Sequence, residues 1–166
     1  MIIYIIKVNI YNDKYTQQKD ETMKLSTRGR YGTRAMLDIA LHQSDGPVPL
    51  KDIAHREDVS LSYLEHIIAP LSAAGLVQST RGPHGGVMLV RPPEGIRLSD
   101  VIRVLEGSVA PVECVDHPST CKRSGLCVTR DVWTEMKKAI EGVLESTTLQ
   151  DLMKRQKTRE QPMYYI

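Results

Sequence analysis

The chain has 166 residues, of which 41% are hydrophobic and 25% are charged, and its net charge is +2. This composition is typical of one folded domain with an appendage, and the small net charge does not by itself indicate a nucleic-acid partner. Three cysteines without a secretory signal favour a reducing compartment over a disulfide scaffold. No apolar run reaches the roughly 18–20 residues that a membrane span needs. We therefore expect a cytoplasmic protein that does not enter a membrane.

Residues 1–22 do not match the rest of the chain. Their apolar run, Met1–Ile6, is shorter than the core of a signal peptide and lacks a basic region before it. One interpretation is a disordered or strand-like extension, and the other is translation that begins at Met23. We favour the second interpretation, which makes residue 23 the start of the first domain.

The segment from Ser26 to His42 is predicted to form an amphipathic helix, because its apolar residues recur at helical spacing. Gly29 and Gly32 should weaken its first turns by up to about 1 kcal/mol each relative to Ala. Tertiary packing must therefore hold that end. Four basic residues near it form a cluster without an acid, which suits either phosphate contacts or a solvated helix face: Lys24, Arg28, Arg30 and Arg34.

Residues 50–74 predict two short helices joined by a tight turn. Asp58 stands at the turn, where Asp tolerates a left-handed backbone. Ser60 or Ser62 is expected to cap the second helix, and Gly75 is expected to end it in the left-handed region. Pro70 should kink the second helix, because proline removes a backbone donor.

Two predicted strands follow, 77–80 and 87–90, around a glycine-rich turn. A helix-turn-helix with such a hairpin is a winged helix, whose second helix fits the DNA major groove. The fold class is therefore mainly α with a small β-wing, and the winged domain is predicted to span residues 23–97. The competing interpretation is a solvated helix face beside an ordinary hairpin. The candidate DNA-binding residues are Arg28, Ser60, Ser62, Tyr63, Glu65, His66, Arg81 and His84.

Residues 98–153 are predicted to hold a cysteine loop and a dimerisation helix. Ser99 should cap a helix over 100–106, and the loop should follow over 108–127. A long helix is expected over 129–146, with an apolar stripe too broad for a monomer to bury. Thr148 and Asp151 resemble a capping box for one more turn. Residues 154–166 are predicted to be a flexible tail. The stripe consists of Val132, Trp133, Met136, Ile140, Val143 and Leu144.

The cysteine loop could hold a metal centre. Cys114, Cys121 and Cys127 are separated by six and five residues, so that three sulfurs can converge on one point. Structural zinc sites more often use close cysteine pairs, whereas iron–sulfur clusters accept looser loops but need four ligands. His117 is the nearest candidate for the fourth, with nearby carboxylates as oxygen alternatives. Three free thiols that sense oxidation are the competing interpretation.

Nothing in the sequence predicts an enzyme. The chain lacks a recognisable nucleophile–base pair, a phosphate-binding glycine loop and a paired-carboxylate pattern.

The chain resembles the Rrf-type winged-helix regulators, which include IscR, NsrR and CymR. The resemblance spans about residues 23–153 and rests on the runs MKLSTRGRYGTRAMLDIAL, GPVPLKDIA, SLSYLEHI, LSAAGLVQSTRGPHGG and TTLQDL together with the three-cysteine loop. It implies a homodimer bridged by the long helix, which binds a two-fold symmetric operator on double-stranded DNA and regulates transcription. We expect a repressor. In IscR-like members, positions matching Ser62, Tyr63, Glu65, His66 and Arg81 approach DNA, and those matching the three cysteines hold an iron–sulfur cluster.

The chain departs from these relatives around the implied cluster. Arg130 stands where IscR has a histidine ligand, and Arg30 stands where NsrR takes a carboxylate ligand from the partner's first helix. The cluster type, 2Fe–2S or 4Fe–4S, and the fourth ligand therefore stay open. CymR-like members work without a cofactor through a partner protein, so thiol oxidation or a partner protein is the alternative form of control. A third hypothesis is a metal-binding interaction module that uses the winged helix for protein contacts.

Overall fold

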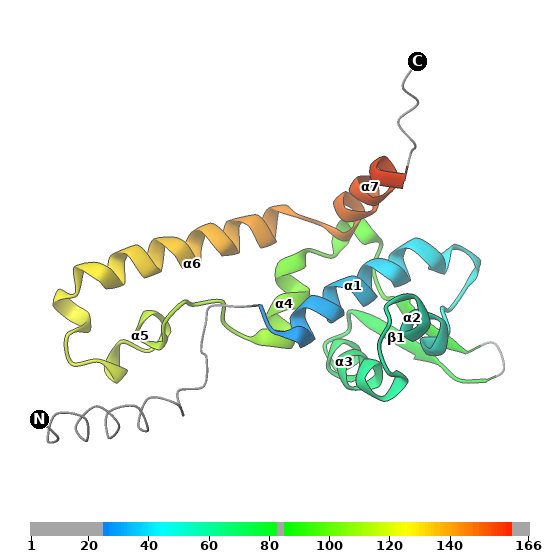
Figure 1. Cartoon of the computed structure of the whole chain (residues 1–166), viewed down its shortest axis with the longest axis horizontal. Coiled ribbons are helices and arrows are strands. Elements are labelled where there is room, and N and C mark those ends of the chain that lie inside the picture. The colour runs from blue at the N-terminus through cyan, green and yellow to red at the C-terminus, as the bar shows by residue number, and fades with distance from the viewer. Residues whose placement is uncertain (1–24, 83–84, 161–166) are drawn as a thin grey trace, which may run out of the picture.

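The computed structural model describes residues 25–82 and 85–160, and these residues form mainly helices with one small sheet (Figure 1). The predicted N-terminal extension, residues 1–22, lies outside the described part of the chain. None of the described helices is long and apolar enough to cross a lipid bilayer. The elements are α1 (Thr27–His42), α2 (Leu50–Arg56), α3 (Leu61–Ala73), β1 (Val77–Thr80), β2 (Gly86–Leu89), α4 (Leu98–Glu106), α5 (Glu113–Asp116), α6 (Val128–Ser146) and α7 (Leu149–Glu160), with 3-10 turns at 43–45, 93–95, 118–120 and 124–126.

The helix-turn-helix forms as the sequence predicts. Asp58 has φ 52° and Gly75 has φ 70°, so both turns use the left-handed backbone expected of these residues. Ser60, rather than Ser62, caps α3, and its side chain accepts a hydrogen bond from Tyr63 N at 3.2 Å. Helix α3 continues through Pro70 and ends at Ala73.

The wing is a two-stranded antiparallel sheet in which Val77 pairs with Leu89 and Thr80 pairs with Gly86. The second strand is shifted by one residue from the predicted 87–90. Val87 also forms a bridge with Val48, with N–O distances of 2.8 Å in both directions. A Cβ on Gly86 would overlap the backbone of Val48, so this close approach requires glycine.

Helix α4 begins earlier than predicted, and Ser99 does not cap it. Arg97 is the residue before the helix, and its backbone N–H donates to Asp100 Oδ2 at 3.3 Å. The helix ends at Gly107, which has φ 79°. The carboxylate at the third position of the helix thus satisfies the backbone N–H of the capping residue Arg97.

One hydrophobic core joins the winged domain to the elements that follow it. Val101 and Leu105 of α4 and Leu149 of α7 lie in the same buried cluster as α1, α3 and the wing, so the core does not divide at residue 97. Asp38 of α1 is 5% exposed, and Arg56 of α2 binds its carboxylate through two hydrogen bonds of 2.8 and 2.7 Å. This ion pair compensates the buried charge at the α1–α2 contact.

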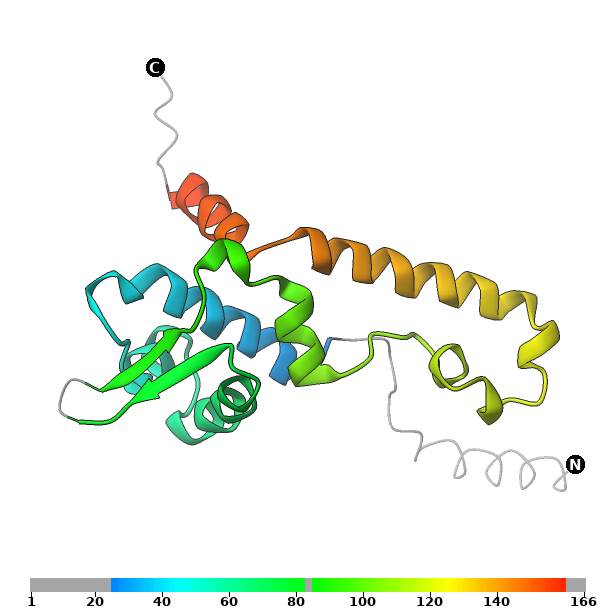
Figure 2. The ribbon, with the colours of Figure 1, turned by 180° about the vertical axis from the view of Figure 1, so that it is seen from behind.

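Helix α6 projects away from the winged domain as an arm, and α5 lies beside its outer half (Figures 1 and 2). None of the residues of α6 is buried. The chain then returns, and α7 packs on α1. Residues 154–160 belong to α7, so the predicted flexible tail is wrong for that part, and 161–166 lie outside the described residues.

Candidate nucleic-acid interface and cysteine loop

The N-cap and first turns of α3 present four of the eight predicted DNA-binding residues to solvent. Ser60, Ser62, Glu65 and His66 are exposed. The opposite side of the helix, with Leu64, Ile67, Ile68 and Leu71, is buried in the core. The apolar stripe thus fixes the rotation of α3, and that rotation leaves hydroxyl, carboxylate and imidazole groups on the outer face.

Tyr63 differs from its neighbours because it is only half-exposed. Its ring meets the ring of Tyr31 edge to face, with 6.1 Å between the centroids and an interplanar angle of 89°. This contact ties the beginning of α3 to α1. The Tyr63 hydroxyl therefore sits on a side chain whose ring is held in place.

The remaining predicted residues flank α3. Arg28 is exposed in the first turn of α1, and Arg81 is exposed directly after β1. Helix α3 packs against both α1 and β1, so each arginine belongs to, or directly follows, an element in contact with α3. His84 lies outside the described residues.

Sequence reasoning missed Lys51 as a candidate for this face. Lys51 is exposed in the first turn of α2 and lines a shallow groove of about 380 Å³ with the base of the wing. Ser79, Thr80 and Gly82 are among the wing residues that line this groove. The sequence signal that could have identified Lys51 is its basic side chain in the first turn of α2, the first helix of the helix-turn-helix.

The cysteine segment is more ordered than the predicted loop. It contains α5 and two 3-10 turns, and its three cysteines are free and partly exposed. Cys127 stands at the N-terminus of α6, and its sulfur lies 3.1 Å from Thr129 Oγ1. This hydrogen bond, together with the backbone N–H of Arg130, lowers the pKa of the Cys127 thiol.

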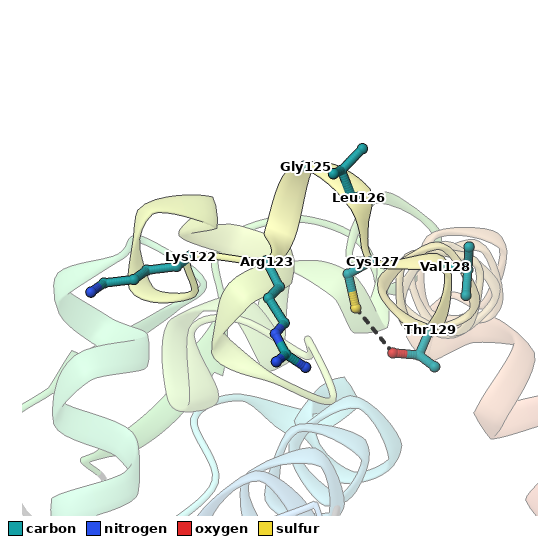
Figure 3. Close-up of a pocket in the computed structure, with 7 residues that line it drawn as sticks. All are labelled: Lys122, Arg123, Gly125, Leu126, Cys127, Val128 and Thr129. Carbon is teal, nitrogen blue, oxygen red and sulfur yellow. Dashed lines mark hydrogen bonds between the residues drawn. The ribbon is translucent and has the colours of Figure 1, made fainter.

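Figure 3 shows Cys127 and Thr129 turned toward each other, with Arg123 on the neighbouring turn. These side chains line an open pocket of about 500 Å³, together with Lys122 and Leu126. Leu126 is 96% exposed. The pocket thus combines a thiol, two cations and an uncovered apolar residue.

Two basic residues of α6 hold the cysteine segment against the helix. Arg130 Nε donates to the backbone carbonyl of Cys114 at 2.8 Å. Two turns later, Lys137 Nζ lies 2.8 Å from Asp116 Oδ1, and this hydrogen bond lowers the pKa of the Asp116 carboxyl. Helix α5 is therefore attached to α6 by side-chain cations.

The three cysteines do not form a ready ligand set in the described part of the chain. Within residues 25–82 and 85–160, no three cysteine, histidine or acidic side chains come together as a ligand set. The expected convergence of Cys114, Cys121 and Cys127 is thus not found, and His117 is exposed. Thiols have the right chemistry for iron, but a cluster would require this segment to rearrange.

The fold and the exposed outer face of α3 define the class of protein as a winged helix-turn-helix. The family model described as "Iron-dependent Transcriptional regulator", named Rrf2, matches residues 25–155. The chain therefore belongs to the Rrf2 family of transcriptional regulators.

Named relatives agree with this assignment. The chain is 48% identical over 132 residues to the protein rrf2 of Nitratidesulfovibrio vulgaris, covering 80% of this chain and 88% of that one. It is similar to the solved structure of T. potens IscR, with a TM-score of 0.72, 45% identity and coverage of 86% and 96%. It is also similar to B. subtilis CymR, described as the global cysteine regulator, with a TM-score of 0.68, 41% identity and coverage of 80% and 97%.

Proposed function

We propose that this protein acts as a homodimer that binds a two-fold symmetric operator and represses transcription, with operator affinity set by the state of its cysteine segment. The observation that carries the DNA-binding part is the outward face of α3. Ser60, Ser62, Glu65 and His66 are exposed there, on a helix whose other side is fixed in the core. This is the presentation that a recognition helix needs in the major groove.

Each group on this face has a role that follows from its chemistry. The Glu65 carboxylate accepts a hydrogen bond from a cytosine amino group and repels DNA elsewhere, so it selects sequence. The hydroxyls of Ser60 and Ser62 donate to phosphates or base edges. Arg81, at the wing, contacts the DNA backbone and supplies affinity that depends on salt.

The arm supplies the dimer contact in this proposal. Val128, Val132 and Val143 of α6 are 77%, 52% and 65% exposed. Burial of such side chains is worth about 1.5–3 kcal/mol each. A second copy of α6 is the partner that matches this surface in length and apolar character.

The cysteine segment is connected to the DNA-binding domain through α4. Glu106, the last residue of α4, accepts a hydrogen bond from Gly29 N at 2.8 Å and a second from the Ser26 hydroxyl. It thus completes the N-terminal cap of α1, immediately before the segment begins at Gly107. A rearrangement of the segment would act on this cap and so on α1.

Two chemistries can set the state of the segment. In the first, Cys114, Cys121 and Cys127 rearrange to bind an iron–sulfur cluster, which accords with the iron-dependent description of the family. In the second, the cysteines respond to thiol oxidation or to a partner protein without a cofactor. The Cys127–Thr129 hydrogen bond favours the second, because it supports a reactive thiol without a metal.

The test begins with protein purified without oxygen. Visible absorption, iron and acid-labile sulfide are measured, and binding to a duplex obtained by selection from random sequence is followed by fluorescence anisotropy. For cluster control, we expect matched iron and sulfide, visible absorbance that Cys121→Ala abolishes, and a changed operator affinity in that variant.

Colourless protein whose operator binding responds to peroxide, and loses that response in Cys127→Ser, would replace cluster control with thiol control. If selection yields no preferred duplex and Arg81→Ala leaves all binding unchanged, the DNA-binding proposal is overturned. The interaction-module hypothesis would then take its place.

A further inference from the structure

Tyr31 of α1 gathers three side chains around one ring. Arg30 Cζ lies 5.4 Å and Arg34 Cζ lies 5.2 Å from the ring centroid. The edge-to-face contact with Tyr63 of α3 completes the arginine–tyrosine cluster, which consists of Arg30, Tyr31, Arg34 and Tyr63. The cluster joins the first half of α1 to the beginning of α3.

The cluster concentrates positive charge at a fixed place. An arginine over a tyrosine ring within about 6 Å gains roughly 0.5–1 kcal/mol at an exposed site. The ring thus restrains two guanidinium groups that would otherwise repel each other. Arg34 is held further by Glu57, whose carboxylate Oε2 lies 2.5 Å from its Nε. Arg30 is exposed beside it.

The position of the cluster indicates DNA as its binding partner. Tyr63 follows the capping Ser60 in the first turn of α3, on the face that the proposed function presents to DNA. Arginine side chains are common donors to the phosphate oxygens of bound DNA, and these two lie on the helix that packs against the proposed recognition helix. Restrained arginines also lose less side-chain entropy when they bind phosphate than mobile ones do.

We propose that Tyr31 is a positioning residue for DNA binding, which holds Arg30 and Arg34 against backbone phosphates and steadies Tyr63 at the start of the recognition helix. The proposal rests on the DNA-binding function proposed above. The proposal makes α1 a third element that contacts DNA, besides α3 and the wing. Its contribution is affinity for duplex DNA of any sequence, because phosphates carry no base information.

The test measures the dissociation constant against salt concentration, for the selected operator and for an unrelated duplex. Arg30→Gln should weaken binding to both duplexes by the same factor. It should also reduce the magnitude of the slope of log association constant against log salt concentration by about 0.9, as expected for one lost phosphate contact. Tyr31→Leu should lower the slope at least as much. Tyr31→Phe should bind like the wild type, because it keeps the ring.

Arg155→Gln is the matched control for charge. Arg155 is exposed on α7, which packs on the side of α1 away from α3, so its loss should leave the slope unchanged (Figures 1 and 2). Thermal unfolding of each variant shows whether weaker binding reflects a lost contact or an unfolded protein. If Tyr31→Leu unfolds, the comparison of Arg30→Gln with Tyr31→Phe still tests the proposal.

The inference is overturned if Arg30→Gln keeps the wild-type affinity and slope while Arg81→Ala weakens DNA binding, an outcome that leaves the proposed function intact. It is also overturned if Arg30→Gln alters only the dissociation of the dimer, because the cluster would then face the other protomer. Absence of binding to either duplex by the wild type would instead reject the proposed function.

Discussion

Among single residues, Gly32 decides how closely α1 approaches α4. A Cβ at this position would overlap Leu105 Cδ1 and lie 3.2 Å from Ile67 Cγ2. The sequence shows only the cost of glycine in a helix, namely a weakened first turn. The structure shows the compensating gain, because the Leu105 side chain of α4 packs directly on the backbone of α1 at Gly32.

Gly32→Ala should therefore destabilise the protein despite the better helix propensity of alanine. Overpacking of a core typically costs about 1–3 kcal/mol, and we expect a loss of that size in the free energy of unfolding measured with urea. Gly125→Ala is the control, since no atom lies within 4 Å of its Cβ position, and it should stay within about 0.5 kcal/mol of the wild type. Equal stability of the two variants would mean that Leu105 moves aside freely.

At the level of secondary structure, the elements with local signals were the ones that could be predicted. Ser60, Asp58 and Gly75 each fix a boundary through their own side chain or backbone, and the helix-turn-helix follows from them. The outward face of α3 follows from the same reasoning, because the buried stripe determines it.

Elements set by distant contacts could not be predicted in this way. The capping box of Thr148 and Asp151 forms as predicted at the start of α7, but the helix continues to Glu160 instead of ending after one turn. Its mostly polar sequence does not indicate that length, and its beginning is docked on the body by distant backbone hydrogen bonds, from Leu149 N to Ile96 O at 3.0 Å and from Leu98 N to Thr147 O at 2.9 Å. The hydrogen bond from Arg130 to Cys114 could not be predicted from the sequence either, because the acceptor is the backbone carbonyl of a residue sixteen positions away. A spacing of cysteines therefore predicts which side chains are available, but not whether they converge.

The attachment of α5 to α6 can be tested with neighbouring lysines. Lys137→Ala removes the bond to Asp116 and should speed amide hydrogen exchange in residues 113–117 while the winged domain keeps its protection. Lys138 is exposed one position further along α6, so Lys138→Ala should leave the exchange unchanged. A segment that exchanges equally fast in both variants and in the wild type would mean that the Lys137–Asp116 bond does not order it.

At the scale of the whole molecule, the arm and the winged domain contribute differently to the hydrophobic core. The arm contributes no buried residue to the single chain, whereas the winged domain contains most of the hydrophobic core. Association of two chains should therefore depend on the arm, and folding of each chain should not.

Replacement of Val132 and Val143 by Glu should convert the proposed dimer into a folded monomer. Both side chains are exposed in the single chain, so the helical circular dichroism should persist, while sedimentation should show a halved mass. Operator affinity should fall steeply, because each protomer then binds one half-site alone. Replacement of Lys154 and Lys157 of α7 by Glu is the control, which adds acids away from the arm. A dimer that survives the valine replacements would place the interface elsewhere.

The bridge between Arg97 and Thr148 brings the two ends of the α4–α6 excursion together at the winged domain. The chain between Gly107 and Ser146 thus leaves the body at the end of α4 and returns beside the start of the same helix, as an insertion does in a host domain. Such a segment can change in length and in its cysteines during evolution while the host keeps its core. A family built in this way can connect one DNA-binding scaffold to many different chemical signals by exchanging the segment alone.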